Sequence, residues 1–165
     1  MKILFVCHGN ICRSPMAEFV MRDLVEKAGL GDQIQVASAA TSTEEIGNPV
    51  YPPARRKLAE HGIGSAGHAA RQMNRQDYDR FDLLIGMDSA NIRNMRRICS
   101  GDSDDKIRML MDYTGVSREV ADPWYTGNFD QTFTDVLSGC KALHTVQGQL
   151  GPERHPRYFR STYPD

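Results

Sequence analysis

The chain has 165 residues, a length that suits one domain with a single hydrophobic core. Its 20 Lys and Arg residues nearly balance its 21 Asp and Glu residues, so the net charge of −1 gives no support for a nucleic-acid-binding protein or a polybasic membrane anchor. No apolar stretch approaches the ~20 residues of a membrane span, and the apolar run after Lys2 is too short for a signal peptide.

The beginning of the chain predicts a strand, a short loop and a helix. Residues 2–6 form a mostly apolar, partly β-branched run, which is typical of a strand buried on both faces. Ser14 is a suitable N-cap, and Pro15 suits the first helical position because proline has a fixed φ and no N–H. Apolar residues then recur at steps of three and four from Ala17 to Ala28, so we expect the helix to end near Gly29.

The intervening sequence Cys-His-Gly-Asn-Ile-Cys-Arg-Ser-Pro, residues 7–15, is interpreted as an anion-binding catalytic loop. The loop N–H groups and the helix N-terminus point to one place and favour a phosphate group there. Arg13 adds a planar fork of donors that matches two phosphate oxygens. The same positive field favours the thiolate of Cys7, which is therefore the candidate nucleophile. The predicted phosphate-binding residues are His8, Gly9, Asn10, Ile11, Cys12, Arg13 and Ser14.

A lone cysteine at the end of a strand is more often a small buried hydrophobe than a nucleophile. Here five residues separate Cys7 from Arg13, with Gly-Asn between them and Ser-Pro opening the helix, and this pattern is far more specific than a glycine-rich loop. The loop lacks the Gly-Lys-Ser/Thr ending of nucleotide-binding phosphate loops, and the chain has no Gly-x-Gly-x-x-Gly motif. The pattern therefore favours catalysis.

Residues 6–18, from Val6 to Glu18, resemble the signature of the low-molecular-weight protein tyrosine phosphatases, and the resemblance extends over roughly residues 1–147. It implies a single α/β domain with a doubly wound, phosphotyrosine protein phosphatase I-like fold, in which a four-stranded parallel sheet carries helices on both faces. The alternation of strand and helix signals along the chain also argues for a parallel sheet. The family mechanism passes through a phosphocysteine and requires no metal or cofactor. Residues 148–165 are expected to form an irregular carboxyl-terminal extension.

The second predicted strand covers residues 34–38, and the sequence from Ser38 onward resembles the family's Ser-Ala-Gly-Thr, with Ala40 in place of the glycine. The resemblance implies that Ser38 helps to hold the phosphate loop in shape. A helix is predicted over residues 53–60. The segment that begins at Gly67 resembles one whose histidine hydrogen-bonds the loop asparagine, so His68 is expected to support Asn10, although a plain surface histidine is an equal alternative.

Residues 42–53 are rich in glycine and proline and predict an irregular loop. In the family this loop walls one side of the active-site cleft and usually carries an aromatic residue, and Glu44 stands at that position here. The neighbouring carboxylates of Glu44 and Glu45 would favour substrates with basic residues beside phosphotyrosine. The alternative is that they are ordinary solvated charges.

Two further buried strands are predicted over residues 83–87 and 107–111. Asp88 follows the first of them and opens a helix, for which it is a suitable cap. In the family a similar Met-Asp-x-x-Asn sequence supplies an aspartate that braces the arginine of the phosphate loop. Asp88 is therefore expected to pair with Arg13, although helix capping alone would also explain it.

The second chemical motif is Asp-Pro-Trp-Tyr, residues 122–125. A phosphocysteine mechanism needs a proton for the leaving group and later a base for water, and one carboxyl group can serve both steps. Asp122 is the candidate, and it matches the Asp-Pro-aromatic-Tyr motif of the family. Trp124 and Tyr125 are expected to wall the substrate cleft and stack on an aromatic ring. In a parallel sheet such residues gather at the carboxyl ends of the strands.

The last predicted helix covers residues 130–146 and places Cys140 in the core. Four cysteines without the spacings of a disulfide framework, one of them a reactive thiolate, suggest the reducing cytoplasm. The family resemblance adds a disulfide between Cys7 and Cys12 that protects the nucleophile from over-oxidation. Simple packing of Cys12 in the loop is an equal alternative.

The sequence therefore predicts a protein tyrosine phosphatase that hydrolyses phosphotyrosine proteins or peptides and small aryl phosphates, as a monomer or a weak dimer. Ile11 favours phosphotyrosine, because the related protein-arginine phosphatases typically have threonine at this position. Arsenate reductases of the same fold are a further alternative, but they need a close pair of additional cysteines that Cys99 and Cys140 do not form in the sequence. A module that only captures phosphotyrosine is the non-enzymatic alternative.

Overall fold

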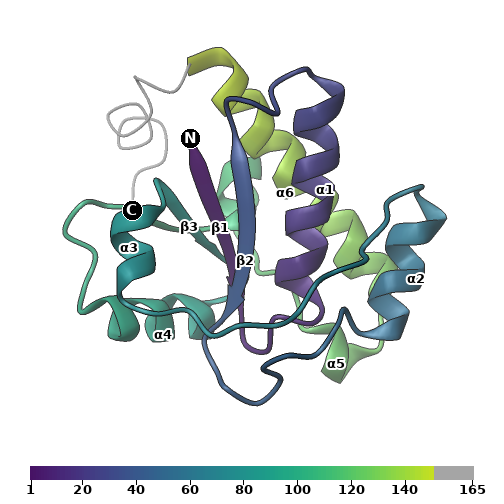
Figure 1. The fold of residues 1–165 in the computed structure, drawn as a ribbon, viewed down its shortest axis with the longest axis horizontal. Coiled ribbons are helices and arrows are strands. Elements are labelled where there is room, and N and C mark those ends of the chain that lie inside the picture. The colour runs from purple at the N-terminus through teal and green to yellow at the C-terminus, as the bar shows by residue number, and fades with distance from the viewer. Residues whose placement is uncertain (151–165) are drawn as a thin grey trace.

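The structure is a computed structural model that describes residues 1–150, and its centre is a parallel sheet of four strands within these residues (Figure 1). The strands are β1 Lys2–Cys7, β2 Gln35–Ala40, β3 Leu83–Gly86 and β4 Ile107–Met109. Their order across the sheet is β2-β1-β3-β4, and every neighbouring pair is parallel. The predicted four-stranded α/β fold is confirmed.

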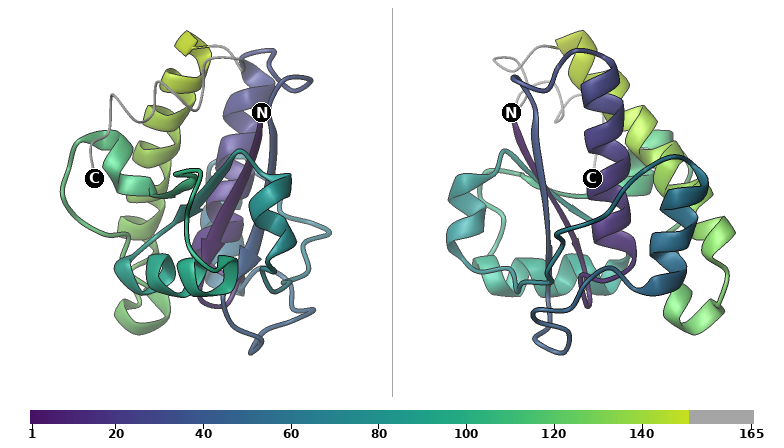
Figure 2. Two further views of the ribbon diagram at one scale, coloured as in Figure 1. Left: turned by 90° about the vertical axis from the view of Figure 1, so that its left-hand side faces the viewer. Right: turned by 45° about the vertical axis from the view of Figure 1, so that its right-hand side comes forward.

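The helices divide between the two faces of the sheet (Figure 2). They are α1 Arg13–Lys27, α2 Pro52–Glu60, α3 Gln76–Arg80, α4 Ser89–Cys99, α5 Pro123–Thr126 and α6 Phe129–Leu150, with a 3₁₀ helix over Leu110–Thr114. Helices α1 and α6 cover one face, and α3 and α4 cover the other. No helix of residues 1–150 is long and apolar enough to cross a membrane.

Strand β1 alternates its side chains between two hydrophobic clusters. Ile3 and Phe5 belong to the cluster under α1 and α6, whereas Leu4 and Val6 belong to the cluster under α4. All four side chains are fully buried, as expected for a central strand of a parallel sheet with both faces covered. The continuous apolar run in the sequence therefore places Cys7 at the end of the most buried strand.

The start of α1 differs from the prediction. The helix begins at Arg13, Cys12 occupies the N-cap position, and no side chain caps the first turn. Ser14 lies inside the helix, and its hydroxyl contacts the preceding loop instead of a helix N–H group. The N-cap prediction for Ser14 was wrong because a hydroxyl that serves the loop is not available to the helix end.

Several helix and strand boundaries also differ from the predicted ones. Strand β2 continues to Ala40, which pairs with Gln72 through a single bridge. Helix α6 continues to Leu150 instead of ending at residue 146, and residues 151–165 of the expected extension lie outside the described residues. The helices α3 and α5 have five and four residues, and segments of that length are too short to show a helical hydrophobic period.

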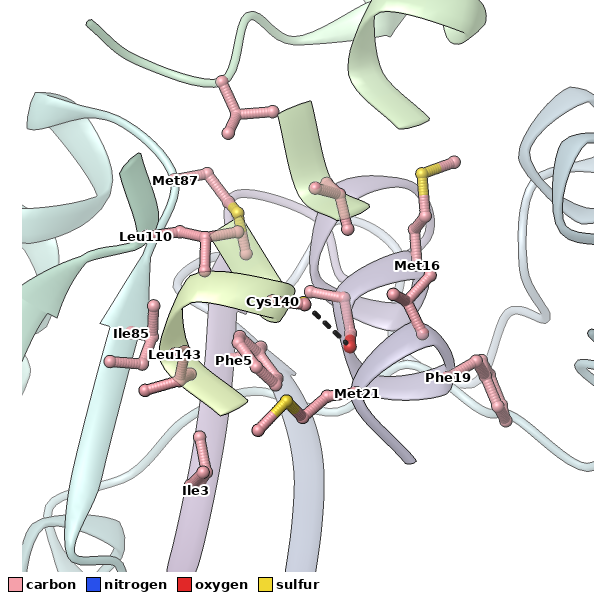
Figure 3. Packing of buried hydrophobic residues seen from close by; sticks show 14 of the residues in the cluster. Ile3, Phe5, Met16, Phe19, Met21, Ile85, Met87, Leu110, Cys140 and Leu143 are labelled. Atoms are coloured by element: carbon pink, nitrogen blue, oxygen red, sulfur yellow. Dashed lines mark hydrogen bonds between the residues drawn. The ribbon is translucent and has the colours of Figure 1, made fainter. Parts of the chain in front are cut away.

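The main hydrophobic cluster packs α6 directly onto α1 and the sheet (Figure 3). Cys140 is fully buried there, and its Sγ lies 3.6 Å from the Ala17 carbonyl oxygen, to which it donates. This confirms the predicted core position. The neighbouring Gly139 allows close contact with Leu110, because an added Cβ would lie 2.5 Å from Leu110 Cγ.

We expect Gly139→Ala to destabilise the protein by about 1–3 kcal/mol, because the new methyl group overpacks the fully buried Leu110. Helix propensity alone predicts the opposite, a gain of up to about 1 kcal/mol. Urea unfolding measures the difference. Ser138→Ala is the matched control, because Ser138 is the preceding, exposed residue of the same helix and its replacement should change stability by less than about 0.5 kcal/mol. Stabilisation by Gly139→Ala would contradict the packing argument.

Candidate active site

The candidate site lies at the carboxyl end of β1, between the ends of β2 and β3. Cys7 is the last residue of β1 and pairs with Ala40 of β2, while Val6 pairs with Gly86 of β3. The strand order places the two neighbours of β1 on opposite sides, so the connections leaving this end diverge. Such a divergence opens the crevice in which open parallel sheets bind their ligands.

Asn10 gives the loop its turn. Its φ is 61°, in the left-handed region that asparagine tolerates better than most residues. The turn directs the Asn10 backbone N–H to Cys7 Sγ, at 3.3 Å. Gly9 has a different role: an added Cβ would lie 3.3 Å from Glu45 Cγ, so the missing side chain allows the 41–47 segment to approach.

Four contacts from three segments hold Asn10, which is fully buried. Its Nδ2 donates to Ser14 Oγ at 2.8 Å and to Ser38 Oγ at 2.9 Å. Its Oδ1 accepts from the Arg71 backbone N–H at 3.2 Å, and its carbonyl oxygen lies 2.7 Å from His68 Nε2. His68 thus contacts Asn10, as expected from the family resemblance. Ser38, which was expected to hold the loop in shape, contacts the Asn10 side chain, whose two N–H groups are both used.

A buried carboxylate, that of Glu18, extends this network. The sequence predicted only that Glu18 adds negative charge to the first turn of the helix, but the helix has no acidic residue in its first turn. Ser38 Oγ donates to Glu18 Oε1 at 2.6 Å, and the other Glu18 oxygen accepts from Arg22. Glu18 is only 9% exposed. Glutamate is rarely buried unless its carboxylate is paired, and here Ser38 and Arg22 pair with that of Glu18. Its position four residues after Ser14 places both side chains on the same face of α1, and this spacing was the available signal.

Ser14 connects the network to the candidate nucleophile. Its Oγ lies 3.0 Å from Cys7 Sγ and 3.4 Å from the Ala39 carbonyl oxygen. Asn10 Nδ2 donates to the Ser14 Oγ, so the one hydroxyl hydrogen of Ser14 can go to Cys7 Sγ or to the Ala39 carbonyl oxygen. The Asn10 N–H donates to Cys7 Sγ, and a thiolate at Cys7, which can only accept, would take the Ser14 hydroxyl as a second donor.

Arg13 is buried and fixed by residues that follow β3 and β4. Its Nη1 donates to Asp88 Oδ2 at 2.7 Å and to the Val120 carbonyl oxygen at 2.9 Å, while its Nη2 lies 3.5 Å from Asp122 Oδ2. Burial alone would lower the pKa of Arg13, but the charges of Cys7, Asp88 and Asp122 raise it above its usual value. The guanidinium therefore remains charged.

Asp88 also caps α4. Its side chain accepts from the Asn91 N–H at 2.7 Å, and the Asn91 side chain returns a contact to the Asp88 N–H, which completes a capping box. The two alternatives left by the sequence are both present, because one oxygen serves the helix and the other serves Arg13.

A pocket of about 140 Å³ opens above the loop. Its lining residues are Cys7, His8, Gly9, Ile11, Cys12, Arg13, Glu44, Glu45, Asp122, Trp124 and Tyr125. Asn10 and Ser14 are fully buried and lie outside this lining. Ser38, His68 and Asp88 likewise lie outside it, where they contact Asn10 or Arg13.

Asp122 is held at the pocket by α5. Its Oδ1 accepts from the Trp124 N–H at 3.0 Å, which caps the helix. The Trp124 ring contacts the ring of Tyr51 at a centroid distance of 5.1 Å, and Tyr51 also contacts Phe129 at 6.1 Å. The sequence analysis missed Tyr51, because a contact between residues so far apart leaves no local pattern.

Comparison with known proteins agrees with this geometry. Residues 2–154 match the family model described as low molecular weight phosphotyrosine protein phosphatase. The chain belongs to this phosphatase family. The low molecular weight protein-tyrosine-phosphatase YfkJ of Bacillus subtilis is 43% identical over 86% of this chain and 92% of its own. The Rattus norvegicus low molecular weight phosphotyrosine protein phosphatase is 39% identical, over 86% of this chain and 92% of its own.

Two solved phosphatase structures show the same architecture. The crystal structure of Bacillus subtilis YfkJ superimposes with a TM-score of 0.88, at 40% identity, over 90% of this chain and 95% of that one. The structure of DARP, a Drosophila arginine phosphatase, superimposes with a TM-score of 0.82, at 29% identity, over 92% of this chain and 99% of that one. Overall architecture therefore does not by itself select the phosphorylated residue.

All four cysteines of this phosphatase chain are free thiols in the structure. Burial, with the charge of Cys7 as the next cause, raises the pKa of Cys12 to about 12, and burial raises that of Cys99 to about 11. Burial also raises the pKa of Cys140. These three are neutral thiols at pH 7.5, which makes them poor nucleophiles. The Cys7–Cys12 disulfide stays a prediction.

We expect iodoacetate at pH 7.5 to alkylate Cys7 first, because Cys7 lines the pocket and its Sγ accepts from the Asn10 N–H, whereas burial raises the pKa of the other three thiols. Peptide mass mapping identifies the modified residue, and inorganic phosphate should slow the reaction by occupying the loop. A raised pKa means that labelling of Cys12 and Cys99 should grow only as the pH approaches about 11–12. Preferential labelling of Cys99 at pH 7.5 would contradict this assignment.

Asp88→Asn separates the two roles of Asp88. Asparagine is an equally good N-cap, so α4 should remain intact, but the ion pair that orients Arg13 is lost. We expect kcat/KM for aryl phosphates to fall at least about 10-fold. Asp88→Ala should lose the cap as well, at an additional cost of about 1 kcal/mol in urea unfolding. Wild-type kcat/KM in Asp88→Asn would show that Asp88 serves only the helix.

Proposed function

We propose that this protein tyrosine phosphatase hydrolyses phosphotyrosine and small aryl phosphates through a phosphocysteine, with Cys7 as nucleophile, Arg13 as phosphate binder and Asp122 as general acid and base. The observation that carries the proposal is that these three side chains line one pocket, above a loop whose shape is fixed by Asn10. Family membership supports the reaction class.

In the first step the loop N–H groups and the Arg13 guanidinium bind the phosphoryl oxygens. The Cys7 thiolate attacks phosphorus, the S–P bond forms, and the bond from phosphorus to the tyrosine oxygen breaks. The electron pair of that bond goes to the phenolic oxygen, which takes the proton of Asp122. Donors fixed before the substrate arrives stabilise the charge that develops in transit without reorganising.

In the second step water attacks the phosphocysteine and gives a proton to the Asp122 carboxylate. The S–P bond breaks, inorganic phosphate leaves, and the electron pair returns to the Cys7 sulfur as a thiolate. Two donors, Ser14 Oγ at 3.0 Å and the Asn10 N–H at 3.3 Å, stabilise that leaving thiolate. The same hydrogen bonds thus favour both the attacking form and the departing form of Cys7.

The competing reactions fit less well. Ile11 lines the pocket, where the related arginine phosphatases typically have threonine, and this favours phosphotyrosine. An arsenate reductase would have to relay a disulfide through two further cysteines, but Cys140 is fully buried under α1 and Cys99 ends α4 in the opposite hydrophobic cluster. We further propose phosphotyrosine proteins as partners, a cytoplasmic location, and a monomer or weak dimer.

The proposal is tested by steady-state hydrolysis of para-nitrophenyl phosphate and a phosphotyrosine peptide in the presence of EDTA. We expect turnover by the wild type, none by Cys7→Ser, and a loss of roughly 10²–10⁴-fold on the peptide in Asp122→Ala. Cys99→Ser is the matched control, because this thiol lies outside the pocket. A wild type that binds phosphotyrosine without turnover, or that needs a metal ion, would overturn the proposal.

A further inference from the structure

The mouth of the pocket is acidic, which is unexpected for a site that binds a phosphate dianion. Glu44, Glu45 and Asp122 contribute three carboxylates to its lining. Among the lining residues of the described chain, Arg13 is the only lysine or arginine, and it already contacts Asp88 and Asp122. Beyond the loop N–H groups, the substrate therefore meets net negative charge.

The two glutamates are fixed at the loop by neighbouring contacts. Glu44 Oε2 lies 3.1 Å from His8 Nε2, and His8 adds positive charge only when it is protonated. Glu45 Oε2 accepts from Asn48 Nδ2 at 2.6 Å, and the Glu45 Cγ packs above Gly9. A carboxylate that is held in place loses less entropy when it binds a cation.

Backbone hydrogen bonds align the segment that carries these glutamates with the phosphate loop. The Thr41 N–H donates to the Cys7 carbonyl oxygen at 2.9 Å, and the Ser42 N–H donates to the His8 carbonyl oxygen at 3.0 Å. The segment therefore runs beside the first loop residues, and Glu44 and Glu45 follow Ser42 after one intervening residue. Their place at the rim is part of the architecture of the site.

Two aromatic side chains of α5 complete the same rim. Trp124 is 56% exposed and Tyr125 is 85% exposed, which is unusual for residues of this size. Exposed aromatic faces bind Lys and Arg side chains through cation–π contacts. Neighbouring carboxylates attract the same cation, so the two attractions act together. Negative charge and aromatic faces at one rim are the features that a basic side chain recognises.

We propose that Glu44 and Glu45, together with Trp124 and Tyr125, bind a lysine or arginine side chain that flanks phosphotyrosine in the substrate. The inference rests on the proposed function and names the substrate class of that site. Because the rim is open to water, the preference should be moderate, about 3–10-fold in kcat/KM over a neutral peptide at low ionic strength. It should shrink as salt screens the charges.

The test uses three phosphotyrosine peptides that differ only in the residues on both sides of phosphotyrosine: Lys, Gln or Glu. We expect kcat/KM to fall in that order for the wild type. Glu44→Gln and Glu45→Gln should each reduce the Lys-to-Gln ratio, and the double variant should bring it close to one. The substitutions keep the shape of the side chains, and circular dichroism checks the fold.

Glu26→Gln is the matched control, because Glu26 is an exposed carboxylate near the far end of α1 and its loss changes the net charge equally. This variant should keep the wild-type ratio. If it reduces the ratio as much as the rim variants do, overall charge explains the preference and the rim assignment is wrong.

Turnover of para-nitrophenyl phosphate, which has no flanking residue, separates the two proposals. Normal turnover with equal kcat/KM for the three peptides would overturn the inference and leave the proposed function intact. Absence of turnover on every substrate would overturn the proposed function, and the inference with it.

Discussion

The phosphate loop depends on one buried residue in a left-handed conformation. Asn10 has a φ of 61°, and a non-glycine residue pays a conformational cost there. Hydrogen bonds from α1, from β2 and from the 68–71 segment offset that cost. Loss of a single partner would leave a buried polar group unsatisfied, at a cost of about 1–3 kcal/mol. The shape of the loop is therefore a property of the whole fold.

The strand order explains how the fold supplies these partners. With β1 in the interior of the sheet, residues from β2 and from the segment after β3 reach the loop from opposite sides. Ser38 of β2 contacts Asn10, whereas Asp88 after β3 contacts Arg13. The two residues that shape the anion site are thus braced from opposite sides, Asn10 from β2 and Arg13 from the segment after β3.

Much of the sheet was predictable from sequence, because buried parallel strands have continuous apolar runs. The functional residues follow the carboxyl ends of these strands, which made their positions predictable as well. The pairings of Asn10 with His68 and of Arg13 with Asp88 were expected from the family resemblance. The contacts of the Glu18 carboxylate and of the Val120 carbonyl were not predicted. In a sequence, a buried glutamate cannot be distinguished from an exposed one, and a backbone acceptor has no signature at all. The helix start at Arg13 was missed for a related reason: the sequence shows that Ser14 has a hydroxyl but not which neighbour will use it.

The charges of the site also bear on how a carboxyl group can serve as an acid beside an arginine. Arg13 directs Nη1 to Asp88 and Val120, so this side of the guanidinium holds the residue in place, while Nη2 faces Asp122 at 3.5 Å. In the proposed mechanism the phosphate dianion binds the loop N–H groups and the guanidinium, so Arg13 serves the substrate while Asp88 and Val120 hold it in place. Asp122 gives its proton to the leaving phenolic oxygen in the first step, and departure of the leaving group with that proton restores the base that the second step needs.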